Sequence, residues 1–173
     1  MITLVCGSPN SGKSARAEEL FSETKAEYKY YVATMQVFDE EGRKRIEKHR
    51  RAREGKGFIT LEIPTKADSA LSCIKDGAHS AILLECLSNL AGNEMHEAGD
   101  FDPDAFEAGF DQLTERIVND IVTLSEAVTQ LIIVANMFKE DDEMYDEETK
   151  AYVRLNNTLT QKIRHLADKV VDI

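Results

Sequence analysis

The sequence of 173 residues has no tryptophan, only three prolines and only three cysteines. Cys6, Cys73 and Cys86 are too few and too widely spaced for a disulfide framework, and no C-x-x-C pair indicates a zinc site. No apolar run approaches transmembrane length, and the N-terminus has neither a basic lead nor a cleavable apolar region. We therefore expect a cytoplasmic protein without a membrane span.

An excess of basic residues is also missing, because the net charge is −11. Proteins that neutralise nucleic-acid phosphates or bind anionic membranes usually present a basic face, so the composition argues against both classes of partner. The exception is a local concentration of cations between Arg43 and Lys56. With 42% apolar residues, the chain suits one globular domain spanning residues 1–173.

A phosphate-binding loop is the most informative motif. Ile2 to Cys6 form an apolar run, and Gly7, Gly12, Lys13 and Ser14 then occupy the fixed places of the pattern G-x-x-x-x-G-K-[ST]. Such a loop wraps backbone N–H groups around phosphates, while the helix N-terminus adds partial positive charge. We expect Lys13 to contact the outer phosphates of ATP or GTP and the Ser14 hydroxyl to bind Mg²⁺. A glycine-rich turn without nucleotide is the structural alternative.

Apolar runs of strand length alternate with helical patterns along the chain. Several of the runs, such as AILL, show no polar alternation, which is typical of strands covered on both faces of a parallel sheet. The pattern predicts an α/β, three-layer P-loop NTPase-like fold with a mostly parallel central sheet flanked by helices. The predicted strands are Ile2–Cys6, Tyr28–Ala33, Phe58–Ile63, Ala81–Leu84, Leu131–Ala135 and Lys169–Ile173. The predicted helices are Lys13–Phe21, Glu40 to about Gly55, Asp68–Lys75, Asp104 to about Ala127, and Glu147–Ala167.

Two segments are predicted to be loops, Gly92–Pro103 and the acidic run Lys139–Glu148. An acidic run is most often a solvated surface. This one follows a predicted strand, and ligands of open α/β sheets bind beyond the carboxyl ends of the strands. A role for the run as a lid over the ligand therefore stays open.

Glu85 directly follows the buried run AILL and is the candidate acidic partner for the metal. A carboxylate at the end of a buried strand needs a partner that offsets its desolvation. If the strands of Glu85 and of the phosphate loop lie close together, Glu85 and Ser14 would both bind Mg²⁺. The alternative is a carboxylate that caps the next helix.

A cationic helix follows the second predicted strand. Thr34, Met35 and Gln36 close that strand, and Asp39 begins a helix rich in arginine and lysine. These cations either form a solvated face or meet an anion, and the triphosphate is the anion that the loop already implies. His49 lies among them and titrates near neutral pH, so it could act as a base or as a nucleophile on phosphorus. Taken alone, such a histidine is more often a surface residue.

The chain resembles the bifunctional adenosylcobinamide kinase and adenosylcobinamide-phosphate guanylyltransferase family of cobalamin biosynthesis. The resemblance follows the family's order over most of the chain, and the combination of YVATMQ with RIEKHR is its specific part. The matching blocks are GSPNSGKS, YVATMQ, RIEKHR, LEIP, ILLECLSNL, IIVAN and the final ADKVVDI.

The resemblance implies that one site phosphorylates the hydroxyl of adenosylcobinamide and then transfers GMP from GTP to the new phosphate. The family passes GMP through a histidine, which His49 matches, and it suggests a homotrimer. Catalysis would then rest on His49 and Lys13. The nucleotide contacts carried over by position are Gly7, Ser8, Pro9, Asn10, Ser11, Gly12, Lys13, Ser14, Thr34, Met35, Gln36, Arg51, Ala52, Arg53, Glu62 and Glu85.

Two other functions remain open. The family typically has a glycine-rich segment after the fifth strand, and of that segment only Asn136 is present here. Acidic residues in its place favour a small-molecule kinase of the same fold that does not transfer GMP. A regulatory module that binds the triphosphate without turnover is the second alternative.

Overall fold

The computed structural model describes residues 1–36, 40–97, 99–139 and 144–173, except for the side chains of residues 41, 45, 46, 48, 49, 52 and 53. The predicted helix start at Asp39 and residues 140–143 of the acidic run lie outside the described residues. The strands are β1 Ile2–Gly7, β2 Tyr28–Ala33, β3 Ile59–Glu62, β4 Ser80–Glu85, β5 Gln130–Asn136 and β6 Lys169–Asp172. The α-helices are α1 Lys13–Ser22, α2 Glu40–Arg53, α3 Leu87–Met95, α4 Pro103–Ala127 and α5 Glu147–Leu166, with 3-10 turns η1 Ala67–Cys73 and η2 Gly77–His79.

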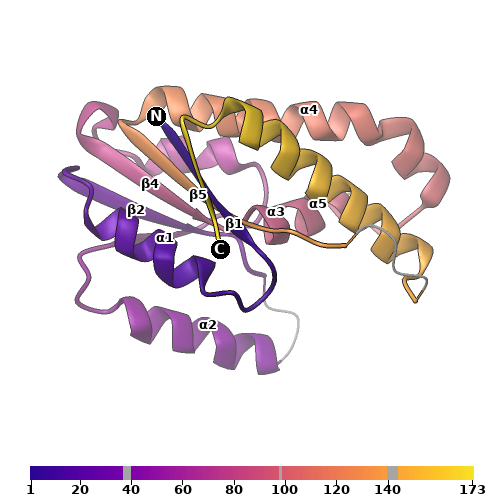
Figure 1. Ribbon diagram of the computed structural model, residues 1–173, viewed down its shortest axis with the longest axis horizontal. Coiled ribbons are helices and arrows are strands. Elements are labelled where there is room, and N and C mark those ends of the chain that lie inside the picture. The colour runs from indigo at the N-terminus through magenta and orange to yellow at the C-terminus, as the bar shows by residue number, and fades with distance from the viewer. Residues whose placement is uncertain (37–39, 98, 140–143) are drawn as a thin grey trace.

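The six described strands form one parallel sheet in the order β3-β2-β4-β5-β1-β6 (Figure 1). This arrangement confirms the predicted fold class. The register brings the last residues of the strands to one edge, since Ala33 pairs with both Glu62 and Glu85, and Gly7 pairs with Asn136. In open α/β sheets this carboxyl edge is where ligands bind.

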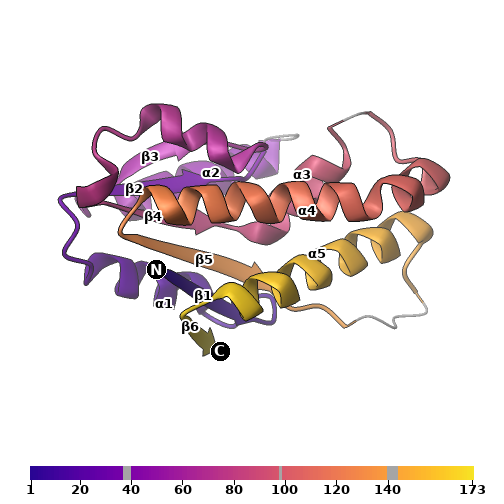
Figure 2. The ribbon, with the colours of Figure 1, turned by 90° about the horizontal axis from the view of Figure 1, so that it is seen from above.

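Each face of the sheet has its own apolar core, because alternate residues of a strand point to opposite faces. Ile82 and Leu84 of β4 pack toward the face that η1, α3, α4 and α5 cover. Ala81 and Leu83 pack toward the opposite face, where Phe21 of α1 is buried. The view from above shows α4 and α5 crossing the first face side by side (Figure 2). In Figure 1, α2 lies beyond α1, furthest from the sheet.

Two predicted segments are wrong. Helix α3 occupies Leu87–Met95, so the predicted loop Gly92–Pro103 begins inside a helix. Gly92 and Asn93 are typical of turns, but burial of Leu87 and Leu90 outweighs this weak local preference. The predicted helix Asp68–Lys75 is instead the 3-10 segment η1. The last two residues of the predicted loop Lys139–Glu148 belong to α5, while its other described residues are not helical.

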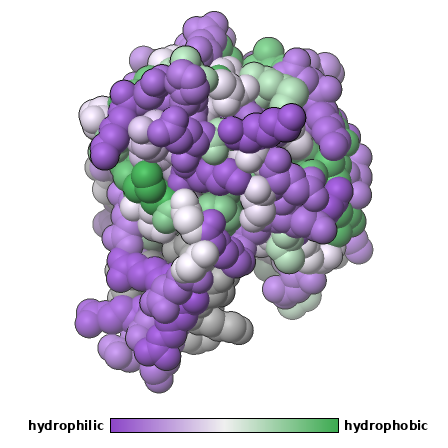
Figure 3. Space-filling model, turned by 90° about the vertical axis from the view of Figure 1, so that its left-hand side faces the viewer, coloured by the Kyte–Doolittle hydropathy of each residue, from purple (hydrophilic) through white to green (hydrophobic). Residues whose placement is uncertain are grey.

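The side of the molecule at the left of Figure 1 is mainly hydrophilic, with apolar residues in small separate patches (Figure 3). Among the described residues, no helix is both long and apolar enough to cross a membrane.

Candidate active site

The phosphate-binding loop joins β1 to α1 and has the backbone that its glycines predict. Gly12 has φ +91°, a left-handed conformation that side chains disfavour, and it directly precedes α1. At Gly7, a Cβ would lie 2.6 Å from the carbonyl oxygen of Ile173 and 2.7 Å from Ser11 Oγ. The two glycines therefore serve different purposes: Gly12 permits the turn into the helix and Gly7 permits close packing against the last residue.

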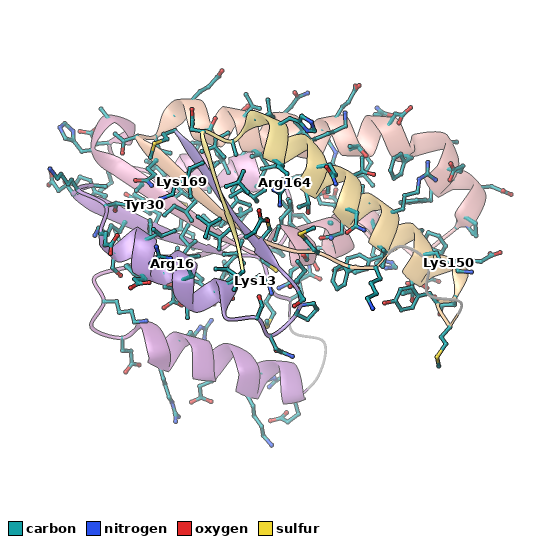
Figure 4. The ribbon with its side chains drawn as sticks, in the orientation of Figure 1. Lys13, Arg16, Tyr30, Lys150, Arg164 and Lys169 are labelled. Carbon is teal, nitrogen blue, oxygen red and sulfur yellow. The ribbon has the colours of Figure 1, made fainter. Side chains whose placement is uncertain are left out.

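Lys13 is the first residue of α1, and its side chain is buried at the end of β1 (Figure 4). Its Nζ donates a hydrogen bond of 2.9 Å to the carbonyl oxygen of Ser8, which holds the ammonium group over the loop. Burial lowers the pKa of Lys13, while the negative charge of Glu85 acts in the opposite direction. A cation in this position faces any phosphate that the loop binds.

A pocket of about 560 Å³ opens above the loop, and we call it the phosphate pocket. The loop and first turn of α1 contribute part of the lining, and the ends of β2, β3, β4 and β5 contribute the rest together with Met35, Cys86 and Asn89. Its lining residues are Pro9, Asn10, Gly12, Lys13, Ser14, Ala15, Tyr31, Ala33, Met35, Glu62, Glu85, Cys86, Asn89 and Asn136.

Ser14 and Glu85 both line the phosphate pocket, although β5 lies between β1 and β4 in the sheet. Each side chain is half-buried and offers an oxygen ligand, and Tyr31 donates a hydrogen bond of 3.0 Å to Glu85 Oε2. Mg²⁺ in nucleotide sites usually takes one or two protein oxygens, with phosphate oxygens and water completing its shell. The donor set therefore fits Mg²⁺. The described residues contain no cluster of three or more His, Cys, Asp or Glu that would hold a metal by itself.

Ser11 adds a second polar group to the loop. Its Oγ is buried and has no hydrogen-bond partner within the described part of the chain. Buried hydroxyl groups in native structures are nearly always paired, so this one is suited to a ligand oxygen.

Thr34 fixes the end of β2 beneath the pocket. Its buried Oγ1 donates to the carbonyl of Cys86 at 2.9 Å and accepts from the Cys86 N–H at 2.7 Å. The Thr34 N–H donates to the carbonyl of Glu85. Asn93 of α3 donates to the carbonyls of Thr34 and Pro64, at 2.7 and 2.8 Å. Three carboxyl ends of the sheet are thus tied to one another and to α3.

Helix α2 borders a second pocket of about 650 Å³, which shares Met35 and Glu62 with the phosphate pocket. Arg43, Lys44 and Arg50 line it, and Arg50 forms an ion pair with Glu62. The two pockets therefore adjoin each other between the loop and the cationic helix. Because Glu40 and Glu47 also line the pocket, its charge is mixed and not simply basic.

The structure brings together some of the expected site residues and leaves others apart. Pro9, Asn10, Gly12, Lys13, Ser14, Met35, Glu62 and Glu85 line the phosphate pocket, and Gly7, Ser8 and Ser11 complete its loop. Gln36 lines the neighbouring pocket beside α2. Arg51 is exposed on α2 and pairs with Glu47. His49, Ala52 and Arg53 also belong to α2, and their side chains lie outside the described set.

Sequence reasoning missed Tyr31, Ala33 and Asn89, which also line the pocket. Tyr31 and Ala33 share one face of β2 because strand side chains alternate. Asn89 lies in the first turn of α3, four residues after Glu85. The alternation of side chains along a strand could have indicated that Tyr31 and Ala33 face the same side. Asn89 could not be found in this way, because its position depends on helix α3, which was not predicted from the sequence.

The segment after β5, where the sequence departs from the family pattern, is held by side chains of α5. Asn156 donates to the carbonyl of Asn136, and Asn157 donates to the carbonyl of Phe138. The Asn136 N–H donates to Ser88 Oγ at 3.0 Å. The Phe138 ring packs against Tyr152 with 5.6 Å between ring centroids. The chain therefore leaves β5 on a path fixed by α3 and α5.

A family model described as cobinamide kinase / cobinamide phosphate guanyltransferase matches residues 3–173. The chain belongs to this family. Two curated relatives carry the name bifunctional adenosylcobalamin biosynthesis protein CobU. The relative from Escherichia coli (strain K12) is 30% identical over 139 residues, which cover 79% of this chain and 75% of the relative. The relative from Salmonella typhimurium (strain LT2) is 30% identical over 131 residues, which cover 75% of this chain and 68% of the relative.

Membership confirms the family resemblance and places the chain among the enzymes of adenosylcobalamin biosynthesis. Cobinamide kinase and cobinamide phosphate guanyltransferase are the two activities for which the family is named, and both use nucleotides. The regulatory module without turnover is therefore not supported. Lys13 of the loop and Glu85 line the same pocket.

Proposed function

We propose that this cobinamide kinase family member phosphorylates adenosylcobinamide with ATP or GTP and then transfers GMP from GTP to adenosylcobinamide phosphate through His49. The observation that carries the proposal is that the phosphate pocket and the pocket beside α2 adjoin each other at Met35 and Glu62. A nucleotide that occupied both pockets would have its γ-phosphate at the loop and the rest of its length directed toward the helix of His49.

In the first reaction, the acceptor hydroxyl attacks the γ-phosphorus. The bond from that phosphorus to its bridging oxygen breaks, the nucleoside diphosphate leaves, and the hydroxyl proton passes to solvent or to a nearby base. Lys13 and the N–H groups at the start of α1 stabilise charge on the phosphate oxygens. Ser14 and Glu85 would hold Mg²⁺, which neutralises phosphate charge when bound.

In the second reaction, a neutral imidazole nitrogen of His49 attacks the α-phosphorus of GTP and pyrophosphate leaves. A phosphate oxygen of adenosylcobinamide phosphate then attacks the same phosphorus, which releases His49 and forms the new P–O–P linkage. Only the unprotonated imidazole carries the required lone pair. Arg43 and Lys44 in the neighbouring pocket are cations suited to the phosphate groups.

Labelled GTP separates the two reactions. We expect label from the γ-phosphate to appear on adenosylcobinamide, and label from the α-phosphate to appear on the protein in an acid-labile form. His49→Ala should abolish the protein label while phosphorylation of adenosylcobinamide continues. His165→Ala is the matched control, because His165 is exposed near the end of α5. Equal protein labelling in wild type and His49→Ala would place the nucleophile elsewhere.

Lys13→Ala tests the loop independently. We expect the rate of phosphorylation to fall about 10²–10³-fold, the loss typical when one group that stabilises transition-state charge is removed. Lys150→Ala is the control, because Lys150 is exposed on α5 and lies well away from Lys13 (Figure 4). Full activity of Lys13→Ala would contradict the assignment of the phosphate pocket.

A kinase without GMP transfer is the alternative, and the segment after Asn136 favours it. Asn156 and Asn157 donate to the carbonyls of Asn136 and Phe138 at the start of that segment, where the family typically has glycines. Phosphorylation of adenosylcobinamide without protein-bound GMP would select this alternative.

The family resemblance also suggests a homotrimer, which we include in the proposal. Light scattering after gel filtration should give three times the mass of the chain, 19.4 kDa. A monomer mass at micromolar concentration would contradict it.

A further inference from the structure

A third pocket, of about 810 Å³, adjoins the phosphate pocket at Asn89 and the α2 pocket at Gln36. We call it the amide groove. One of its walls is a single face of α3, on which Asn89, Gly92, Asn93 and His96 recur at steps of three and four residues. The opposite wall comes from the loops after β2 and β3, with Gln36 and Thr65.

The face of α3 in the groove has an unusual composition for a helix surface. It carries amides and a glycine instead of lysines and glutamates, while Leu87, Leu90 and Ala91 bury the other face. A Cβ at Gly92 would make an ordinary van der Waals contact with the ring of Tyr152, whose nearest carbon would lie 3.5 Å away. Alanine therefore fits at this position, whereas a larger side chain must displace the ring or enter the groove.

Tyr152 of α5 supplies an aromatic surface to the groove. Its hydroxyl donates to the carbonyl of Ser88 at 3.3 Å, and its ring contacts Phe138. Burial raises the pKa of Tyr152 to about 12, so the phenol stays neutral. Glu97 and Asp100 line the rim of the groove, where Glu97 pairs with Lys66 at 2.6 Å and Glu148 pairs with His96 at 3.1 Å. The groove thus combines amides, a neutral aromatic ring and the carboxylate of Asp100.

We infer that the amide groove binds the corrin edge of the acceptor, and that the acceptor's hydroxyl-bearing arm passes Asn89 into the phosphate pocket. This assignment rests on the proposed function. A corrinoid is a large ring fringed with primary amides, which pair with side-chain amides such as those of Asn89 and Gln36 as both donors and acceptors. Asn93 offers its amide oxygen, because its amide nitrogen already donates to the carbonyls of Thr34 and Pro64. Its cobalt centre gives adenosylcobinamide positive charge, which suits the Asp100 carboxylate at the rim. Asn89 lines both pockets, so an arm beside it reaches the nucleotide's outer phosphates.

Gly92→Leu tests the groove by filling it. We expect the KM for adenosylcobinamide to rise at least tenfold and the dissociation constant for a fluorescent GTP analogue to change less than twofold. Gly109→Leu is the matched control, because Gly109 is also helical and a Cβ there would meet nothing within 4 Å. Thr65→Arg obstructs the groove from the opposite wall with added positive charge, and should raise the same KM even if Gly92→Leu does not fold.

The outcomes separate this inference from the proposed function. If wild type phosphorylates adenosylcobinamide and a folded Gly92→Leu or Thr65→Arg variant does so with an unchanged KM, the corrinoid binds elsewhere and the inference is wrong. If wild type binds the GTP analogue but neither phosphorylates nor binds adenosylcobinamide in equilibrium dialysis, the proposed function fails, and the groove assignment fails with it.

Discussion

At the scale of single residues, Thr34 shows how a side chain outside the pocket lining determines the pocket's shape. Its hydroxyl satisfies both the N–H and the carbonyl of Cys86, and these groups have no access to water in that position. Glu85 precedes Cys86, so the same pair of hydrogen bonds helps to set the position of the candidate metal ligand.

Valine has nearly the same volume as threonine but lacks the hydroxyl group. Thr34→Val should therefore destabilise the protein through the loss of hydrogen bonds. We expect the free energy of unfolding to fall by about 1–3 kcal/mol, because the substitution leaves the buried Cys86 N–H unpaired, while the Cys86 carbonyl keeps its bond from the Leu90 N–H. Urea denaturation measures the change. Thr34→Ser keeps the hydroxyl and should recover most of the loss; equal destabilisation by both variants would show that the methyl group matters and the hydrogen bonds do not.

Asp120 on α4 makes stability depend on pH. Burial raises its pKa to about 6, and nearby Asp68 of η1 adds to the rise, while Arg116 on its own helix opposes it and Glu94 of α3 reinforces it. The native state thus holds this proton more tightly than the unfolded chain, whose ordinary value is 3.8. Between these two values the contribution of Asp120 to stability falls as pH rises.

Asp120→Asn should remove that contribution. We expect the variant to resist urea better than wild type at pH 7 and to show a smaller decline in its urea midpoint between about pH 4 and pH 6. Asp111→Asn is the control, since Asp111 is exposed on the same helix. An Asp120→Asn midpoint that tracks wild type across this range would contradict the prediction.

Residues within one contiguous motif could be predicted from the sequence, whereas residues that converge through the fold could not. Lys13 and Ser14 were predicted because the loop pattern fixes their chemistry locally. Glu85 was predicted because a charged residue after a buried run must lie at the strand's end. Asn89 and Tyr152 approach the site only because α3 and α5 pack on the same face of the sheet.

At the scale of elements, buried strands were the easiest to predict. Runs such as those in β4 and β5 are apolar at every position because helices cover both faces. Helix α3 was missed because Gly92 and Asn93 resemble a turn, and η1 was predicted as an α-helix because its apolar spacing suits both forms. Burial against the sheet decides these cases, and a local pattern does not contain that information.

Replacing glycine by alanine should have opposite effects on stability at Gly77 in η2 and at Gly109 in α4. A Cβ at Gly77 in η2 would lie 1.9 Å from the carbonyl oxygen of Ala127 at the end of α4. Gly77→Ala should therefore destabilise the protein by about 1–3 kcal/mol through overpacking. Gly109→Ala, inside α4 with open space around it, should stabilise by about 0.5–1 kcal/mol. Thermal denaturation of the two variants and wild type measures both effects. A higher Tm for Gly77→Ala than for wild type would contradict the close contact between η2 and α4.

At the scale of the whole molecule, nucleotide binding should increase the stability of the folded protein by a measurable amount. A ligand that binds only the folded state at one hundred times its dissociation constant adds about 2.7 kcal/mol. For a chain of this size we expect GTP with Mg²⁺ to raise the Tm by about 5–11 °C. Chelation of the metal should reduce the rise, as should Lys13→Ala. An identical Tm with and without GTP would contradict nucleotide binding to the folded chain.

The charge interactions around α2 should make the activity of the enzyme depend on salt concentration. None of the described side chains of α2 is buried, and the contacts described around it include the exposed ion pair of Arg50 with Glu62 and the pair of Lys56 with Glu18. The range of such charge interactions is only about 8 Å at 0.15 M salt and shorter in more concentrated solutions. Raising ionic strength should therefore slow GMP transfer, which depends on the helix of His49, more than phosphorylation at the loop. The salt concentration would then determine how much adenosylcobinamide phosphate accumulates relative to the product that carries GMP.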